Sequence, residues 1–148
     1  MASTYLSLHY HLVFSTKNRE PLIISDWRSS LYEYLGGTID GLGGFSQGIG
    51  GTADHVHLLV GLKATICLAD FLREVKKASS AWIHSKRGMR SFAWQEGYAA
   101  FTVSASSRPA VQTYIENQLE HHRVKSFRVE LIAMLERAGV EYDSRYLD

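Results

Sequence analysis

The chain has 148 residues, of which 45% are hydrophobic and 21% charged, and its formal net charge is +1 at pH 7. This composition predicts one domain, residues 1–148, and excludes a chain dominated by disorder. No segment has the apolar length of a membrane span, and the first residues show no export signal. Cys67 is the only cysteine, which excludes a disulfide framework. We therefore expect a cytoplasmic protein in which Cys67 is a small buried residue.

Positive charge is concentrated in residues 63–90, which contain seven Lys or Arg against two acidic residues, a local charge of +5. Arg73, Lys76 and Lys77 are spaced to share one face of a helix, a pattern that suits a phosphate backbone. A solvated helix face that binds nothing is the other interpretation of this pattern.

The chain begins with a strand pattern followed by a helix pattern. Residues 5–15 alternate apolar and polar side chains as a strand does, and a polar turn follows at residues 16–21. Apolar side chains then recur with helical spacing over residues 25–35. The pair Gly36-Gly37 would end this helix.

Glycine dominates the next segment. Residues 36–51 contain eight of the 12 glycines of the chain, and residues 45–49 within them are predicted to form a twisted strand. These glycines do not match a phosphate-binding loop, so we expect no nucleotide cofactor. Residues 55–62 are too apolar for anything but a buried strand.

Helix patterns prevail in the remainder of the chain. Residues 67–85 have the spacing of an amphipathic helix, and a strand is predicted at residues 98–104. Two further helices are predicted, over residues 110–122 and over residues 127–138, with Gly139 as the stop of the second.

The predicted order β-α-β-β-α-β, followed by helices, indicates the fold class. It is typical of an α+β, ferredoxin-like fold, in which an antiparallel sheet carries two helices on one face. We expect the other face to be open for a functional site.

Two histidines stand at the start of strand 55–62, in the run Asp54-His55-Val56-His57. Because side chains alternate along a strand, His55 and His57 point the same way. Neutral imidazole is a common metal ligand, so the pair offers two adjacent positions to a cation. Two structural histidines at a strand edge are the alternative interpretation, and a metal site needs a third donor.

A second group of polar side chains lies on helix 110–122. Tyr114, Gln118, His121 and His122 fall on one broad stripe of this helix. An amide oxygen is a hard ligand, and with two imidazoles it favours Mg²⁺ or Mn²⁺ over zinc. The alternative is a tyrosine that reaches out from a core-facing helix beside a solvent-exposed glutamine.

These motifs together resemble one known family. The segments that carry the resemblance are Tyr5–Ile23, Asp54–Val60, Phe92–Tyr98, Tyr114–Gln118 and the pair His121-His122. In this order and spacing they are similar to the single-tyrosine HUH transposases of single-strand-transposing insertion sequences. Relatives that act on repetitive palindromes share the same motifs.

The resemblance implies specific roles. His55, His57 and Gln118 would bind the divalent cation, Mg²⁺ or Mn²⁺, and Tyr114, on the C-terminal helices, would be the nucleophile. Attack of Tyr114 on single-stranded DNA would give a 5′-phosphotyrosine and a free 3′-hydroxyl, with no need for ATP. Candidate DNA contacts are the basic residues of the turn and of the helix, Lys17, Arg19, Arg73, Lys76 and Lys77.

The expected protein is a transposase that cleaves and rejoins single-stranded, hairpin-containing DNA ends. Two ends must be cut and each chain has one nucleophile, so we expect a homodimer. Its sheet would extend through an edge of strand 5–15 or of the glycine-rich strand, and bases would stack on Trp94 or Tyr98. A catalytically idle hairpin-binding module and a hydrolase that activates water are the alternatives.

Overall fold

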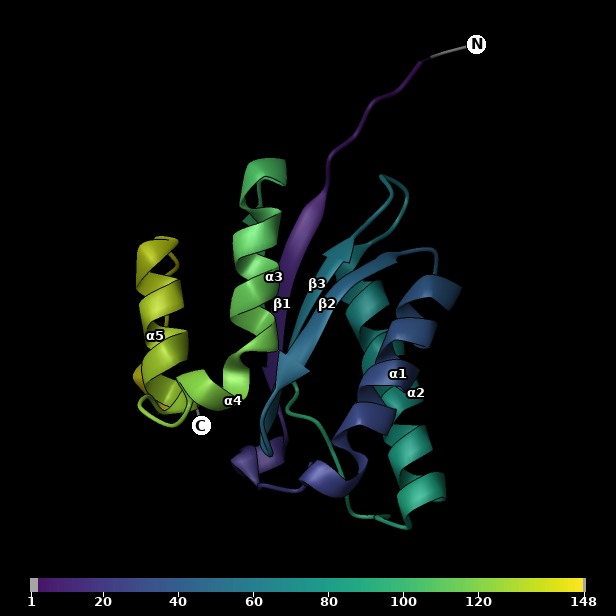
Figure 1. Cartoon of the computed structure of the whole chain (residues 1–148), viewed down its shortest axis with the longest axis vertical. Helices are drawn as coiled ribbons and strands as arrows, with labels where there is room; N and C mark the ends of the chain where they lie inside the picture. Colours follow the sequence, from purple (N-terminus) through teal and green to yellow (C-terminus); the bar gives the residue numbers. More distant parts are fainter. Residues whose placement is uncertain (1–2, 148) are drawn as a thin grey trace.

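The computed structural model describes residues 3–147 and has a four-stranded antiparallel sheet at its centre (Figure 1). The strands lie side by side in the order β2-β3-β1-β4. Their bounds are β1 His9–Ser15, β2 Phe45–Gly51, β3 His55–Gly61 and β4 Ala99–Val103. This order confirms the predicted ferredoxin-like α+β fold.

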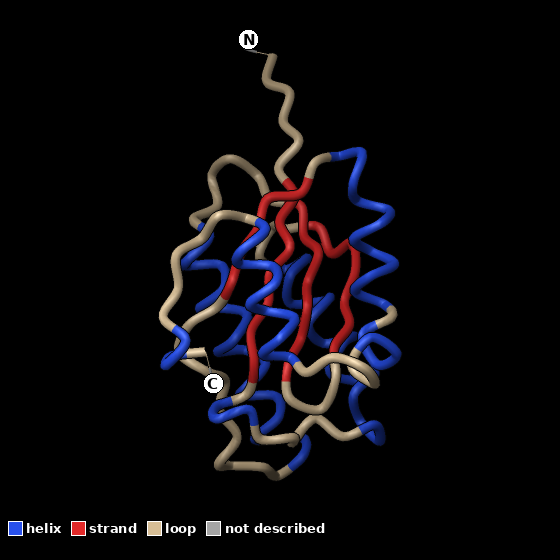
Figure 2. Tube along the Cα trace, turned by 90° about the vertical axis from the view of Figure 1, so that its left-hand side faces the viewer, coloured by secondary structure: helices blue, strands red, loops and turns tan. Residues whose placement is uncertain are grey.

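Helices form a layer on each face of the sheet (Figures 1 and 2). Their bounds are α1 Ser25–Gly41, α2 Leu68–Arg87, α3 Arg108–Glu116, α4 Gln118–His121 and α5 Phe127–Arg137. The pair α1 and α2 covers one face, and the C-terminal helices α3 to α5 lie over the other. The expectation of an open second face is therefore wrong, because these C-terminal helices cover it.

Strand β3 faces two different environments. Val56, Leu58 and Val60 pack into the main apolar core with α1 and α2. Because alternate side chains point to opposite faces, His55 and His57 lie beneath the C-terminal helices. The buried strand predicted at residues 55–62 is thus present, and its alternation separates the core from the histidines.

The first strand and the first helix differ from their predicted bounds. Strand β1 begins at His9 rather than at residue 5. It pairs with a neighbour on both edges, whereas the glycine-rich β2 lies at the edge of the sheet formed by residues 3–147. Of the two strands proposed for dimer contact, β2 is therefore the one with an unpaired edge. Helix α1 continues through the glycine pair because Ile39, on its last turn, is fully buried. The helix ends before Gly43, whose φ of +88° favours glycine.

The helix predicted at residues 110–122 is broken at Asn117. Asn117 has φ −98° and ψ 23°, and it separates α3 from the short helix α4. Leu119 of α4 is 57% exposed, whereas Ile115, four residues earlier on α3, is fully buried. The break changes the direction of the chain, so an extrapolated helical face does not describe α4.

Helix α3 lies directly on the glycine-rich strand β2. A Cβ atom at Gly50 would lie 1.9 Å from the carbonyl oxygen of Ile115. No side chain fits at this position, because the backbones of β2 and α3 are in contact. The glycines of β2 thus allow the helix that carries Tyr114 to approach the sheet.

Two side chains lie in surroundings other than those predicted. Cys67 precedes α2 and is exposed rather than buried. Trp94, proposed for stacking on DNA bases, is buried and donates a 2.9 Å hydrogen bond to Ser79 Oγ, whereas Tyr98 is 40% exposed. Trp94 is therefore a core residue.

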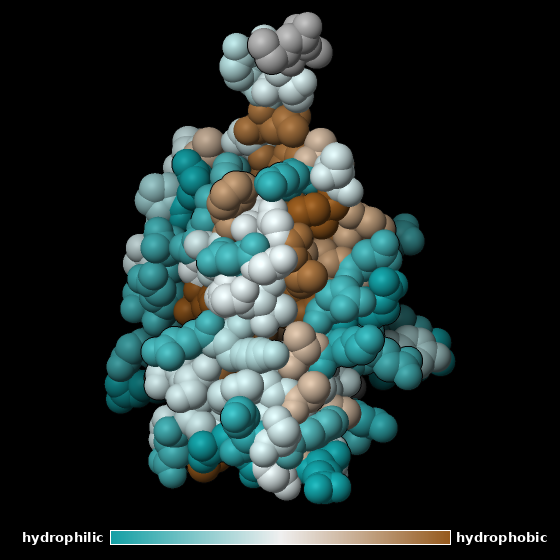
Figure 3. All heavy atoms as spheres, turned by 90° about the vertical axis from the view of Figure 1, so that its right-hand side faces the viewer, coloured by the Kyte–Doolittle hydropathy of each residue, from teal (hydrophilic) through white to brown (hydrophobic). Residues whose placement is uncertain are grey.

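Hydrophilic and neutral residues cover much of the outward side of the α1 and α2 layer (Figure 3). Within residues 3–147, the helices are too short or too polar to cross a lipid bilayer.

Candidate active site

Strand β3 holds two imidazoles side by side in the protein interior. His55 and His57 are both fully buried, and their ring centroids are 5.1 Å apart. The strand pairs with β1 on one edge and with β2 on the other. The positions of both histidines are therefore set by two neighbouring strands.

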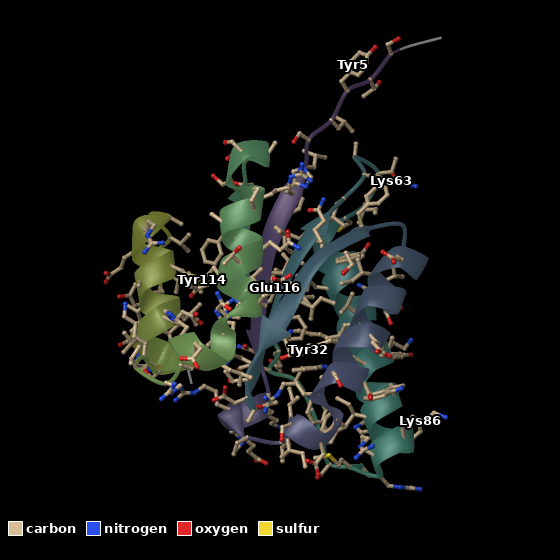
Figure 4. The ribbon with its side chains drawn as sticks, viewed as in Figure 1. Tyr5, Tyr32, Lys63, Lys86, Tyr114 and Glu116 are labelled. Carbon is tan, nitrogen blue, oxygen red and sulfur yellow. The ribbon has the colours of Figure 1, made fainter. Side chains whose placement is uncertain are left out.

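The C-terminal helices bring three more side chains to these histidines. Gln118 Oε1 lies 3.1 Å from His55 Nε2, and Glu130 Oε1 lies 3.0 Å from His57 Nε2. The Tyr114 hydroxyl donates a hydrogen bond to Glu130 Oε2. Figure 4 shows Tyr114 on the side of α3 that faces α5.

Hydrogen bonds fix the proton position on His55 and the amide orientation of Gln118. His55 Nδ1 lies 2.8 Å from Asp54 Oδ1. Burial alone would raise the pKa of Asp54, but hydrogen bonds from His55 and Thr52 hold it below its ordinary value. A carboxylate only accepts, so neutral His55 carries its proton on Nδ1. The Gln118 amide nitrogen donates to Glu130 Oε2 at 3.1 Å, which leaves Oε1 facing His55.

Two acceptor atoms, His55 Nε2 and Gln118 Oε1, therefore face each other at 3.1 Å. Adjacent ligands at roughly 2.1 Å from a six-coordinate cation lie about 3 Å apart, so the spacing of these two atoms suits a shared divalent cation. Four side chains, His55, His57, His122 and Glu130, have ligand atoms within 4.8 Å of one another. The donor set fits a metal ion.

His57 has a second buried histidine behind it. His11 Nε2 lies 2.7 Å from His57 Nδ1. Burial lowers the pKa of His11 to about 3 and that of His57 to about 4, so both rings are neutral near pH 7. When His57 Nε2 is a metal ligand, its proton is on Nδ1 and is donated to His11, which orients the ring.

Glu130 lies at the centre of the group. The residue is 3% exposed, and His122 Nε2 is 3.2 Å from Oε1. Burial alone would raise the pKa of Glu130, but hydrogen bonds from His122, His57 and Tyr114 lower it well below its ordinary value. Burial and the bond to this carboxylate raise the pKa of the Tyr114 hydroxyl. Tyr114 is thus protonated and oriented toward an ionised carboxylate.

A cavity of about 560 Å³ adjoins the hydroxyl of Tyr114. Its wall includes side chains from β1, β4, α3 and α5, and Lys125 and Arg137 contribute positive charge to it. Tyr114 and Glu130 line this cavity, whereas the fully buried His55 and His57 are not part of its wall.

The sequence matches the family described as IS200-like transposases over residues 4–118. The chain belongs to this family. It is 29% identical over 119 residues to the ISDra2 transposase TnpA of Deinococcus radiodurans, which covers 75% of this chain and 84% of that protein. The transposase of insertion sequence IS200 from Salmonella typhimurium is 25% identical over 130 residues, with 84% and 85% coverage.

Two solved structures of transposases share the fold of this chain. A transposase from Deinococcus radiodurans superimposes with a TM-score of 0.64 and 27% identity, covering 80% of this transposase and 96% of that chain. A REP-associated tyrosine transposase bound to a REP hairpin has a TM-score of 0.55 at 13% identity, covering 78% and 70% of the two chains. The second likeness is one of fold alone.

The basic residues predicted to contact DNA lie in two places in this IS200-like transposase. Lys17 and Arg19 form a short 3-10 helix directly after β1, beside the Asp54 end of β3. The basic residues of α2 lie in the layer on the opposite face of the sheet from Tyr114. Lys63 and Lys86, labelled in Figure 4, lie on that side as well.

Two of the three basic side chains of α2, Lys76 and Arg73, already have partners within the chain. Lys76 Nζ donates to the carbonyl oxygens of Gln95 and Gly97 at 2.9 and 2.6 Å, and burial lowers its pKa to about 8. Arg73 pairs with Asp70 at 2.9 Å. Lys77 is exposed. The structure thus does not bring these three residues to the histidine group.

Sequence reasoning missed Glu130 and gave no specific role to His11 or His122. Helix α5 buries Phe127, Leu131 and Leu135 together with Glu130. An acidic residue at a position that helical spacing assigns to the apolar face was the available signal, because a carboxylate is seldom buried without a specific partner.

Proposed function

We propose that this transposase cleaves and rejoins single-stranded DNA at the ends of an insertion sequence, with Tyr114 as the nucleophile. The observation that carries the proposal is the buried group in which the Tyr114 hydroxyl lies next to a donor set suited to a cation. His55, His57 and Gln118 would hold Mg²⁺ or Mn²⁺. Their two imidazoles and one amide oxygen suit such an ion and leave room for phosphate oxygens.

The reaction exchanges one phosphodiester bond for another. The Tyr114 oxygen bonds to phosphorus as the bond from phosphorus to the 3′-oxygen breaks; the phenol loses a proton and the departing 3′-oxygen gains one. The 5′-phosphotyrosine retains the bond energy, so a 3′-hydroxyl can later reverse the step without a nucleotide cofactor. When bound, the cation favours the phenolate and makes the phosphorus more electrophilic.

The chain's own side chains position the nucleophile. Glu130 Oε2 accepts the hydrogen bond of the Tyr114 hydroxyl and so turns it toward the histidines. Lys125 and Arg137, on the wall of the adjoining cavity, can neutralise phosphates of a strand that enters there. Lys17 and Arg19 are the candidate contacts nearest to the β3 end of the site.

The test is capture of the covalent intermediate on a denaturing gel. Purified protein is incubated with Mn²⁺ and labelled single-stranded DNA from the ends of its element, each end including its hairpin. Wild-type protein should form the adduct, and Tyr114→Phe should form none while it still binds the hairpin. Tyr142→Phe, which alters an exposed tyrosine hydroxyl that donates to Glu136, should behave as wild type.

An adduct in Tyr114→Phe would refute the assignment of the nucleophile. Hairpin binding by a wild-type protein that forms no adduct would instead favour a catalytically idle DNA-binding module. We also propose a homodimer as the acting form, because two ends must be cut and each chain carries one Tyr114. A monomer at micromolar concentration in light scattering of the same samples would contradict that part.

A further inference from the structure

The carboxylate of Glu130 faces two groups at once. Oε1 points to imidazoles, with the Nε2 atoms of His57, His122 and His55 at 3.0, 3.2 and 3.8 Å. Oε2 points to the nucleophile and accepts hydrogen bonds from the Tyr114 hydroxyl and, at 3.1 Å, from the Gln118 amide. One carboxylate therefore connects the cation donors to the nucleophile.

The surroundings of Oε1 match those of a ligand atom. Oε1 lies among the same nitrogen atoms, those of His55 and His57, that the proposed function gives to the cation. Its carboxylate is almost completely buried, and an ionised group in such a place needs compensating positive charge. The Nε2 atoms of His57, His122 and His55 all lie within 3.8 Å of Oε1, so a cation placed among them would be within reach of the carboxylate and the imidazoles together. A divalent cation there would also balance the charge of the carboxylate.

We propose that Glu130 is a fourth protein ligand of the divalent cation, through Oε1, and that its Oε2 holds the Tyr114 hydroxyl beside the metal site. This inference rests on the proposed function, since it uses the same cation. It concerns a part of the chain outside the match to the family, which ends at residue 118, whereas α5 begins at Phe127. The C-terminal helix would then be a working part of the active site.

The packing of α5 fixes the position of Glu130 independently of its carboxylate. Helix α5 is anchored by Phe127, Leu131 and Leu135, which pack with Val13 of β1. Phe127 also stacks on the His55 ring, with centroids 4.3 Å apart. These contacts fix the part of α5 that bears Glu130, so the carboxylate position is set by packing that a change of Glu130 alone leaves in place.

The test measures Mn²⁺ binding, which does not depend on activity. Full-length protein, freed of metal with EDTA and dialysed, is titrated with Mn²⁺ by calorimetry. Glu130→Gln keeps the shape of the side chain and removes its charge, and it should bind Mn²⁺ at least about tenfold more weakly than wild type. Glu136→Gln, on the exposed side of the same helix, should bind as wild type.

Two further measurements separate the ligand role from other roles. Tyr114→Phe should keep Mn²⁺ affinity within about twofold, because the phenol is held by Glu130 and is not itself a ligand. In thermal melts, Mn²⁺ should raise the melting temperature of wild type more than that of Glu130→Gln. If Glu130→Gln does not fold, Glu130→Asp keeps the charge but withdraws it by one methylene, and it should show the same loss of Mn²⁺ affinity.

The outcomes distinguish this inference from the proposed function. Mn²⁺ affinity equal to or greater than that of wild type in folded Glu130→Gln would overturn the ligand role; a greater affinity would mean that the carboxylate competes with the cation. The proposed function stands in that case if wild type still forms the adduct. Glu130-dependent Mn²⁺ binding without any adduct would instead refute the proposed function and leave the ligand role intact.

Discussion

The contact between Gly50 and α3 predicts that Gly50→Ala displaces the helix that carries Tyr114 and so disturbs the candidate active site. A Cβ at this position would lie 1.9 Å from the Ile115 carbonyl oxygen, and real Cβ atoms essentially never come closer than 3.0 Å. The backbones of β2 and α3 must therefore move apart by at least 1.1 Å, the difference between these values. Ile115 stands between Tyr114 and Gln118, and functional groups tolerate displacements of only about 0.5 Å.

Two measurable consequences follow from this displacement. Overpacking of this kind costs about 1–3 kcal/mol, which corresponds to a melting temperature lower by about 3–10 °C for a chain of this size. Mn²⁺ affinity should fall as well, because Gln118 moves with α3 while His55 stays on β3. Differential scanning fluorimetry and calorimetry on the purified variant measure the two effects.

Gly37→Ala is the matched control. Gly37 lies exposed inside α1, and a Cβ there has no neighbour within 4 Å. Alanine favours a helix over glycine by up to about 1 kcal/mol, so this variant should be slightly more stable and bind Mn²⁺ as wild type. A Gly50→Ala variant with the stability and Mn²⁺ affinity of wild type would refute the packing of α3 on β2 within one chain.

Two further predictions concern acid stability and DNA binding. Because burial lowers the pKa of His11 to about 3 and that of His57 to about 4, the folded state binds fewer protons than the unfolded state below pH 6.5. The metal-free protein should thus lose stability as pH falls from 6.5 to 4.5, by up to about 1.4 kcal/mol per pH unit for each histidine. Urea unfolding of His11→Gln should show a smaller loss, and an equal loss would contradict the pKa assignment. If the α2 face binds DNA, Arg73→Glu combined with Lys77→Glu should reduce the log–log salt slope of hairpin-strand binding by about 1.4, at about 0.7 per phosphate contact. An unchanged slope would show that this face is only solvated.

Residue patterns in the sequence predict the strands and two parts of the candidate site, the histidine pair of β3 and the pair Tyr114 and Gln118. Alternation along β3 predicts that His55 and His57 share a face, and the structure places both under the C-terminal helices. Helical spacing places Tyr114 and Gln118 on one stripe, and despite the break at Asn117 these two side chains do meet, because both donate a hydrogen bond to Glu130 Oε2. These features depend on local backbone geometry, which residue patterns record directly.

The remainder depended on contacts between distant segments. Asn117 interrupts the helix although Asn has an ordinary helix propensity, so no local pattern marks the break. Glu130 meets His57 across 73 positions of the sequence, and only the packing of α5 on the sheet brings them together. The cover over the second sheet face has the same origin, because an amphipathic helix indicates that it packs on something but not on what.

The two halves of the site are held by different forces, and this difference bears on how DNA enters. His55 and His57 are fixed by backbone hydrogen bonds on both edges of β3. Tyr114 and Glu130 are held by side-chain packing of α3 and α5, and their mutual hydrogen bond lies beside the cavity. Separating two packed helices leaves the backbone hydrogen bonds of both intact, whereas displacing a central strand breaks two ladders. A strand of DNA that enters the cavity meets Tyr114 and Glu130 first, and it reaches the fully buried His55 and His57 only if the helices move, while β3 keeps the two histidines in place as the proposed cation ligands.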